Sequence, residues 1–304
     1  MIKSLQTSLL IEGSQVSFYN LQKDPESVVI VALGLAGTEQ SPYFADLVAH
    51  LDKGSLIVGV RGLETSSHAS SSKFFLKNDC SRITRVMSWV YAMYPDTPKI
   101  GIGISLGGAL ILRHQSKKEL LFDEIVMLST SLWYEHAVHT MPESLMGRLA
   151  NKVLTWWQFE RLYFGDNYLT TVRRPTTRQW LRLLMANNLL QQDKVLCALY
   201  DMDYREYLDD LDMRWMTKQV HNVNYLISSK DPMFSKAHLH VTLNALEGSL
   251  FNYEVVSFGG HGNFTLKSRN DYMITYCQEV INRVRARKQN DLASSPTEAL
   301  ALAG

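Results

Sequence analysis

The feature that most restricts the fold is a set of short segments in which every residue is apolar. Residues 28–33 (VVIVAL) and 56–60 (LIVGV) contain no polar side chain. Strands of this composition are usually covered on both faces, as in a parallel sheet that is flanked by helices. The sequence therefore predicts a central sheet in which these two segments are buried strands.

Further strands are expected where short apolar runs recur along the chain. The additional runs are residues 8–12, 15–19, 99–104, 125–128, 222–228 and 253–258. The first two alternate between apolar and polar residues, which favours an antiparallel pair at the edge of the sheet. Segments with helical spacing of apolar residues begin near Ser41, near Asp79 or Ser81, at Ser105 and near Arg269. This alternation of strands and helices predicts an α/β fold with a doubly wound, mostly parallel sheet.

The alternation stops between about residues 136 and 218. This stretch contains four of the six tryptophans of the chain and has the pattern of several helices. Because strand patterns resume at Asn222, we interpret it as a helical cap insertion over one end of the sheet; the alternative is a second, independent helical domain. The expected organisation is core at 1–135, cap at 136–218, core again at 219–288 and a flexible tail at 289–304.

Charge, cysteine content and hydropathy exclude several classes of protein. The chain has 31 Lys and Arg against 30 Asp and Glu, so a net charge of +1 gives no general field for nucleic acid. Three scattered cysteines form no disulfide framework or zinc motif and fit a reducing compartment. No apolar run approaches the roughly 18 residues of a membrane span or resembles a secretory signal, so we expect a soluble, cytoplasmic protein. No nucleotide-binding glycine motif and no metal-ligand spacing is present, so no cofactor or metal is expected.

The sharpest local motif is GISLGG at residues 103–108. It follows an expected strand and precedes a helix-compatible run, which is the context of a nucleophile elbow. In such a turn Ser105 occupies a strained backbone region, and glycines two before and two after it leave room for neighbouring chain. Without this context, the motif would be an ordinary glycine-rich turn.

A serine hydroxyl needs a base, and the base needs an acid to orient it. The base candidate is His261, which lies between glycines in a loop after an expected strand. The acid candidate is Asp231, at the carboxyl end of the strand expected at 222–228, where open α/β sheets carry their sites. The order Ser105, Asp231, His261, each after a strand, predicts a catalytic triad.

A fourth motif, LGLAG at residues 33–37, directly follows the strand expected at 28–33. Acyl transfer develops a negative oxygen that needs hydrogen-bond donors already in place. We expect the backbone N–H groups of Leu35 and Leu106 to form this oxyanion hole. The alternative is a glycine-rich turn that only begins the next helix.

These motifs together resemble the α/β-hydrolase superfamily over nearly the whole chain outside the insertion. More narrowly, LGLAG (33–37) with SPY (41–43), Arg61-Gly62, GISLGG (103–108), Asp231-Pro232 and GGH (259–261) resemble the lipid-ester branch of carboxylesterase- and lipase-like hydrolases. That branch usually has a histidine where this chain has Leu33. The resemblance implies a serine hydrolase that forms an acyl-enzyme.

The expected substrate is a carboxylic ester or thioester with an apolar acyl group. The aromatic cap, with Trp156 and Trp157 as candidate substrate-binding residues, favours a hydrophobic pocket. Arg174, Arg178 and Arg182 share helical spacing, which suggests either a solvated helix or an anion site for coenzyme A or a carrier protein. Two alternatives remain open: an acyltransferase that uses the same triad, and a non-catalytic binding protein on the same fold.

Overall fold

The computed structural model of the chain describes residues 7–11, 14–35, 37–61, 80–164, 176–261 and 271–294. Its strands are β1 (Thr7–Ile11), β2 (Ser14–Tyr19), β3 (Ser27–Ala32), β4 (Ser55–Val60), β5 (Lys99–Ile104), β6 (Glu124–Leu128), β7 (Val223–Ser228) and β8 (Asn252–Val256). They form one eight-stranded sheet in the order β1-β2-β4-β3-β5-β6-β7-β8. All the expected strands are confirmed, and their ends lie within two residues of the expected positions.

The sheet is mostly parallel, as predicted. β1 pairs with β2 and β2 with β4 in antiparallel orientation, whereas β3 to β8 are joined by parallel pairs. The expected antiparallel edge pair is therefore confirmed. Side chains of β3 alternate between the two faces, because Val28 and Ile30 belong to one hydrophobic cluster and Val29 and Val31 to another.

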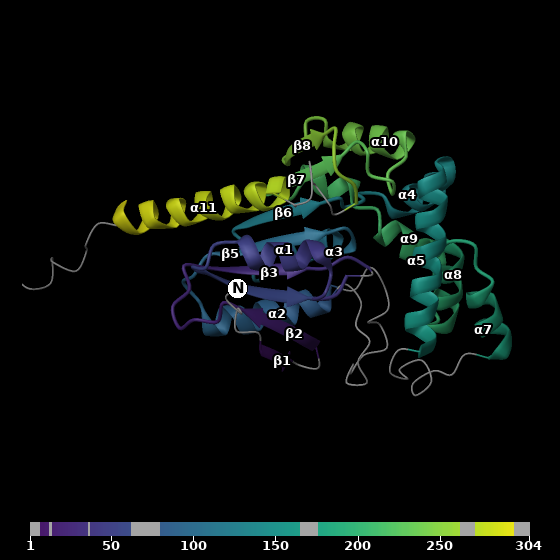
Figure 1. Cartoon of the computed structure of the whole chain (residues 1–304), viewed down its shortest axis with the longest axis horizontal. Coiled ribbons are helices and arrows are strands. Elements are labelled where there is room, and N and C mark those ends of the chain that lie inside the picture. The colour runs from purple at the N-terminus through teal and green to yellow at the C-terminus, as the bar shows by residue number, and fades with distance from the viewer. Residues whose placement is uncertain are drawn as a thin grey trace, which may run out of the picture.

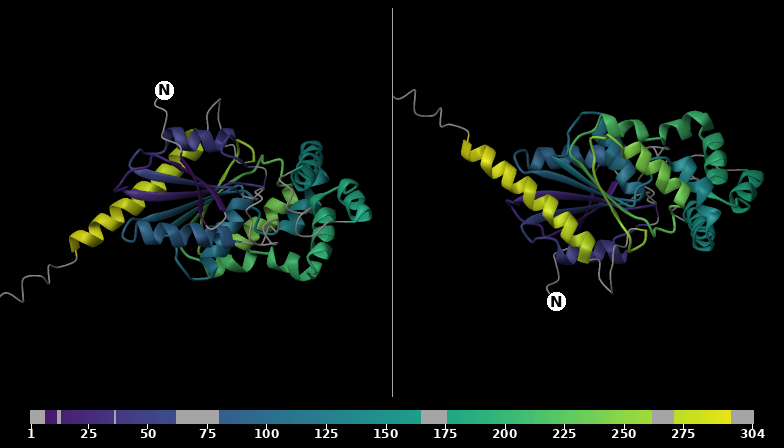
Figure 2. Two further views of the ribbon diagram at one scale, coloured as in Figure 1. Left: turned by 90° about the horizontal axis from the view of Figure 1, so that it is seen from below. Right: turned by 90° about the horizontal axis from the view of Figure 1, so that it is seen from above.

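Helices cover both faces of the sheet, which explains why the inner strands β3 and β4 are buried and almost entirely apolar (Figures 1 and 2). On one face lie α1 (Pro42–His50) and α11 (Asp271–Ser294), and their side chains join the cluster around Val29. On the other face lie α2 (Ser81–Met93), α3 (Leu106–Ser116) and α10 (Lys236–Leu246), with the cluster around Val28. The doubly wound α/β architecture is thereby confirmed.

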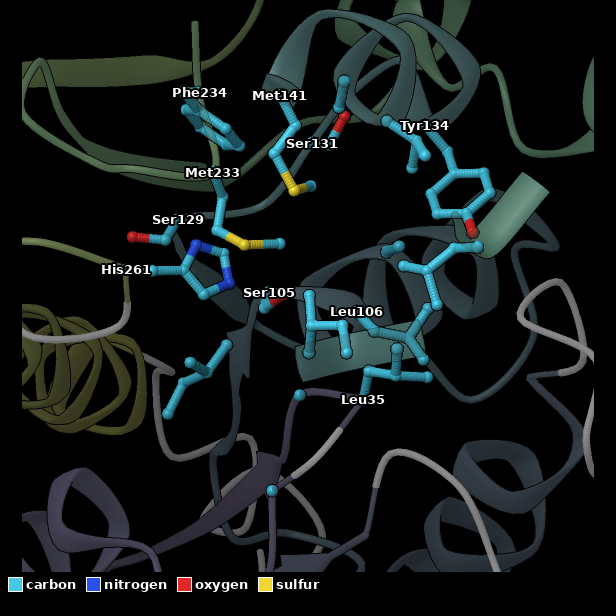
Figure 3. A pocket seen from close by; sticks show the side chains of 18 of the residues that line it. Leu35, Ser105, Leu106, Ser129, Ser131, Tyr134, Met141, Met233, Phe234 and His261 are labelled. Carbon is cyan, nitrogen blue, oxygen red and sulfur yellow. The ribbon is translucent and has the colours of Figure 1, made fainter. Parts of the chain in front are cut away.

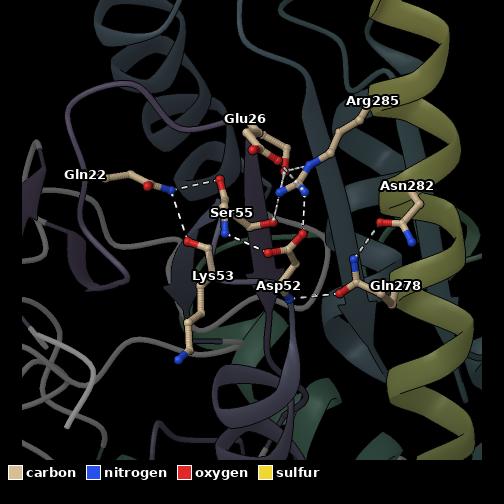
Figure 4. Close-up of polar contacts among 10 residues, drawn as sticks. Gln22, Glu26, Asp52, Lys53, Ser55, Gln278, Asn282 and Arg285 are labelled. Atoms are coloured by element: carbon tan, nitrogen blue, oxygen red, sulfur yellow. Dashed lines mark hydrogen bonds and ion pairs between the residues drawn. The ribbon is translucent and has the colours of Figure 1, made fainter. Parts of the chain in front are cut away.

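A buried arginine fixes α11 to the amino ends of β3 and β4 (Figure 4). Arg285 is only 9% exposed, and its guanidinium donates hydrogen bonds to the hydroxyl groups of Ser27 and Ser55. It also forms ion pairs with Asp52 at 2.6 Å and with Glu26 at 2.8 Å. This cluster lies at the amino ends of the strands and therefore holds the scaffold rather than a site at their carboxyl ends.

The chain between β6 and β7 forms a helical cap at one end of the sheet (Figure 1). Its described helices are α4 (Tyr134–Thr140), η1 (Met141–Glu143), α5 (Leu145–Phe164), α7 (Thr177–Leu184), α8 (Leu189–Leu199), α9 (Tyr204–Asp210) and η2 (Arg214–Lys218). Leu35 and Leu106 of the body pack into the cap's hydrophobic cluster with Val138 and Leu189. The cap and the body therefore share one hydrophobic cluster.

Among the residues that the structure describes, no helix is long and apolar enough to cross a bilayer. In the same ranges no group of three or more histidine, cysteine, aspartate or glutamate side chains is placed to hold a metal ion. The three cysteines, Cys80, Cys197 and Cys277, are all buried thiols.

Candidate active site

Ser105 lies in the turn between β5 and α3, as the motif predicted. Its backbone has φ 54° and ψ −121°, a combination that a residue with a side chain rarely adopts. Such strain costs on the order of 1–3 kcal/mol and persists where the surrounding structure enforces it. The turn aims the Ser105 side chain into a pocket at the carboxyl edge of the sheet (Figure 3).

The glycines around Ser105 are required by close packing of the backbone. A Cβ on Gly103 would lie 2.2 Å from the Cα of Gly108, and one on Gly107 would lie 1.9 Å from the carbonyl oxygen of Ala32. A Cβ on Gly108 would come within 2.0 Å of the Thr130 hydroxyl. All three distances are shorter than real contacts allow, so the motif is what lets the turn fit between its neighbours.

Asp231 and His261 meet beside Ser105. Asp231 follows β7 and His261 follows β8, and His261 Nδ1 lies 2.9 Å from Asp231 Oδ2 and 3.2 Å from Oδ1. The Asp231 side chain is fully buried, and its Oδ1 also accepts a hydrogen bond of 2.8 Å from the Met233 amide. His261 and Ser105 line the same pocket, and their side chains lie next to each other in it (Figure 3).

Ser228, a residue that sequence reasoning missed, ties together the loops that carry the acid and the base. It ends β7, and its hydroxyl donates to the carbonyl oxygen of Phe258 at 2.7 Å. The same hydroxyl accepts from the amide of Lys230 at 3.1 Å, just before Asp231. A small hydroxyl residue at the carboxyl end of a buried strand was the available signal.

The segment expected to form the oxyanion hole lies directly against Ser105. A Cβ added to Gly34 would be 3.2 Å from the Cβ of Ser105, so the backbone beside Leu35 approaches the nucleophile closely. Leu106 begins α3, where an amide has no acceptor within its own helix. Leu35 and Leu106 both line the pocket. Their positions suit the expected role.

An ion pair anchors the chain just beyond this segment. Arg61, at the end of β4, contacts the carboxylate of Glu39 at 2.7 Å, and Ser17 donates to the same carboxylate at 3.3 Å. Burial disfavours the charge on Glu39, but the hydrogen bonds and charge of Arg61 outweigh it, so the pKa of Glu39 is lowered. Arg61, one of the residues that carried the family resemblance, therefore stabilises the loop before α1.

The pocket has a volume of about 330 Å³ and is mostly apolar. Met233 and Phe234 contribute to its wall from the loop of Asp231, and Ser129 and Ser131 from the loop after β6. The cap contributes Tyr134, Ala137, Val138, Met141, Leu154, Leu189, Leu211 and Met213. A cavity with these walls accepts a flexible apolar chain next to Ser105.

Trp156, one of the two tryptophans expected in the pocket, is not part of its wall. Trp156 is 57% exposed, packs against Phe159 and is absent from the pocket lining. The reason is the orientation of α5, which turns Leu154 towards the pocket and Trp156 towards solvent. The side chain of Trp157 lies outside the described residues, as does Arg174 of the expected anion site.

A pair of histidines lies behind the pocket. His238 of α10 is completely buried; its Nε2 lies 3.1 Å from the hydroxyl of Ser131, and its Nδ1 lies 3.1 Å from Nδ1 of His136. The ring of Trp133 stacks on His136 with the centroids 4.8 Å apart. A sequence pattern cannot indicate which partner faces a buried polar ring such as that of His238.

Because His238 is buried, we expect the folded protein to lose stability in acid. Burial, reinforced by His136, lowers the pKa of His238 to about 3 from 6.5. Below pH 6.5 the unfolded chain takes up a proton that the folded chain does not, so this contribution is complete above pH 6.5 and declines towards pH 3. We expect a loss of about 2 kcal/mol between pH 7 and pH 5 from this residue.

Denaturant unfolding at pH 7 and pH 5 measures this loss. His238→Gln should remove about 2 kcal/mol of the difference between the two pH values, whatever its effect at pH 7 alone. His50→Gln, at an exposed position, is the matched control. An equal difference in wild type and His238→Gln would contradict the assignment.

Proteins of known structure share the fold of this chain. No protein-family model matches the sequence. An esterase from Pyrococcus furiosus is 13% identical, with a TM-score of 0.55, and the likeness covers 92% of this chain and 91% of that one. A highly thermostable carboxyl esterase from Bacillus coagulans, solved in complex with glycerol, is 12% identical, with a TM-score of 0.52, over 92% of this chain and 100% of that one. At these identities the likeness is one of fold.

Proposed function

Because the chain has the α/β-hydrolase fold, we propose that it is a serine hydrolase acting on carboxylic esters or thioesters with an apolar acyl group. The observation that carries this proposal is the meeting of three elements in one pocket. Ser105 sits in a strained turn, and His261 beside it contacts the buried carboxylate of Asp231 at 2.9 Å. The names of the structural neighbours, both esterases, agree with it.

The proposed reaction follows from these positions. Oγ of Ser105 attacks the carbonyl carbon while Nε2 of His261 takes the hydroxyl proton. Asp231, as the acceptor at Nδ1, keeps the imidazole in the tautomer whose Nε2 is free and stabilises the imidazolium that forms. Collapse of the tetrahedral intermediate breaks the bond to the alcohol or thiol, which receives the proton from His261. Water then attacks the acyl-enzyme by the same steps and releases the acid.

The backbone amides of Leu35 and Leu106 are the proposed donors to the negative oxygen of the intermediate. Gly34 brings the first of them close to Ser105, and the start of α3 presents the second. Donors fixed before the reaction cost no reorganisation when the charge develops, and each is worth about 2.7–4 kcal/mol of barrier. Two such donors supply much of the acceleration expected of this site.

The apolar cap wall is the proposed acyl-binding region. Ala137 lies on α4 and lines the pocket with a small side chain. Ala137→Leu should fill space that the end of a long acyl chain occupies, while leaving room for a short one. Since each buried methylene is worth about 0.8 kcal/mol, exclusion of two of them should lower the ratio of long-chain to short-chain kcat/KM roughly tenfold.

A panel of activated esters of graded acyl length measures this ratio. Trp156→Ala is the matched control in the cap, because that side chain faces away from the pocket. We expect Trp156→Ala to preserve the wild-type preference. If Ala137→Leu leaves the ratio unchanged in a folded protein, the acyl chain does not lie along the cap wall. Thioesters in the same panel, and product analysis with an added alcohol, distinguish hydrolysis of each class from acyl transfer.

A further inference from the structure

Helix α5 exposes its apolar side. Leu145, Leu149, Val153 and Trp156 recur every three or four residues, so they form one stripe along the helix, and each is more than half exposed. Met146 lies beside the stripe and is 59% exposed. Exposed apolar residues are normal when scattered, but a continuous stripe marks an interaction surface.

The opposite side of α5 is partly polar and buried. Asn151, Thr155 and Gln158 are at most 5% exposed, and the backbone carbonyl of Thr155 accepts a hydrogen bond from Gln192 of α8. A helix on a protein in water normally turns its polar side outward. In α5 polar side chains face the cap interior while a large apolar stripe faces outward, which indicates that the outer environment is itself apolar when the protein is at work.

Helix α7, which packs against α5 through Trp180 and Phe159, repeats the pattern. Leu181, Leu184 and Met185, at the end of α7, are exposed, and Met185 reaches 74%. We call the two sets together, Leu145, Met146, Leu149, Val153, Trp156, Leu181, Leu184 and Met185, the cap stripe. Both helices lie at the end of the molecule away from the C-terminus of α11 (Figures 1 and 2).

Basic charges predominate along the cap stripe; the acidic residues nearest to it in the sequence are Glu143, two positions before Leu145, and Glu160, four positions after Trp156. Arg148 and Lys152 are exposed on α5, and Arg178 and Arg182 are exposed on α7. No acidic residue occurs between Ser144 and Trp156 or between Thr176 and Gln192. No ion pair within the described parts of the chain engages any of the four basic side chains. This local positive charge stands out in a chain whose net charge is only +1.

We propose that the cap stripe docks the protein on an anionic lipid bilayer. Leucine and tryptophan side chains on one side of a helix, with lysine and arginine beside them, are the composition of helices that lie in the membrane interface. The apolar side chains enter the boundary between headgroups and acyl chains, and the four basic side chains meet lipid phosphates. The inference concerns binding and does not depend on the hydrolysis proposed above.

Charge complementarity favours a bilayer over other occupants. In a symmetric dimer the same basic residues would face one another across a small distance, which is repulsive. An acidic carrier protein would pair with the basic side chains. It would not account for the eight exposed apolar side chains on the two helices, because association directed by charge does not need so large an apolar surface. A bilayer offers anionic headgroups to the basic side chains and an apolar interior to the apolar side chains on the same surface.

Docking by this face would place the pocket near the lipid. Leu154 lines the pocket while its neighbour Val153 belongs to the cap stripe, so only the width of α5 separates the acyl-binding wall from the docking face. Met141, just before α5, also lines the pocket. An apolar substrate leaving the bilayer would therefore have a short path to Ser105.

Vesicle sedimentation with the full chain tests the proposal. One set of vesicles is phosphatidylcholine, and the other is an equal mixture of phosphatidylcholine and phosphatidylglycerol. We expect binding to the mixed vesicles that weakens with added salt, and much weaker binding to phosphatidylcholine alone. Arg178→Gln with Arg182→Gln should weaken binding to the mixed vesicles about 25-fold, because each basic side chain contributes about fivefold.

A second variant tests the apolar part. Leu149→Gln with Met185→Gln should weaken binding to the mixed vesicles on the order of tenfold, and both positions are exposed enough for the fold to tolerate glutamine. Met93→Gln and Lys117→Gln, at exposed positions of the body, are the matched controls and should bind as wild type does. Thermal unfolding verifies that every variant is folded.

Each contrary outcome overturns the proposal. Equal binding to both kinds of vesicle removes the role of the basic side chains, and equal loss in the control variants removes the role of this face. Absence of binding contradicts docking outright. If the protein instead dimerises, and Leu149→Gln with Met185→Gln makes it monomeric without any vesicle binding in the wild type, the cap stripe is an interface between copies.

Discussion

Ser105→Ala is expected to lower kcat/KM for a short activated ester by about 10⁴- to 10⁶-fold. Without the hydroxyl no acyl-enzyme can form, and His261 has no nucleophile to activate. What remains is the weaker effect of the pocket and the oxyanion donors on direct attack by water. The backbone of this turn is strained with either side chain, so the folded structure should persist.

Initial-rate measurements on purified protein test this loss. Ser116→Ala, near the other end of the same helix, is the matched control and should retain wild-type activity. Circular dichroism and thermal unfolding show whether each variant is folded. Near-normal activity in a folded Ser105→Ala protein would remove Ser105 from the reaction and, with it, the proposed triad.

Asp231→Asn is expected to lower kcat by about 10⁴-fold. An asparagine of the same shape can present its amide hydrogens to Nδ1 of His261, which then favours the imidazole tautomer that carries its proton on Nε2. A ring in that state cannot accept the Ser105 proton. Asp231 is buried and accepts a hydrogen bond from the Met233 amide. Its carboxylate is therefore held in place to stabilise the imidazolium.

The control for this change is another aspartate with a structural bond to a backbone amide. Asp203 caps α9 by accepting a bond of 2.8 Å from the amide of Glu206, at an exposed site in the cap. Asp203→Asn should leave kcat close to the wild-type value, because asparagine caps helices equally well. A silent Asp231→Asn beside a severe Asp203→Asn would place the acid in the cap.

Much of the fold was predictable because strands that are buried on both faces appear in the sequence as runs of apolar residues. β3 and β4 contain only apolar side chains except for Ser27 and Ser55 at their first positions, so their composition alone indicated inner strands. The motif around Ser105 was equally informative, since a Cβ added to Gly103 or Gly107 would lie about 2 Å from neighbouring backbone atoms, which no other residue avoids. Where close packing excludes every side chain, the glycine that the structure needs is visible in the sequence.

The sequence does not reveal the residues whose role depends on orientation. Trp156 and Leu154 lie two positions apart on one helix, and only the packing of α5 against α8 decides which of them faces the pocket. His238 contacts Ser131 and His136, which lie more than 100 positions away in sequence. Tertiary contacts between distant segments leave no local periodicity to detect.

The central claim is that Ser105 is the nucleophile of an acyl-transfer site, and covalent labelling tests it most directly. A fluorophosphonate reacts with a serine that a neighbouring base activates, and mass spectrometry of the digested protein identifies the modified residue. The account predicts one label on Ser105 in the wild type, none in Ser105→Ala and strongly slowed labelling in Asp231→Asn. A label on Ser129 or Ser131, which line the same pocket, or an unlabelled wild-type protein, would contradict it.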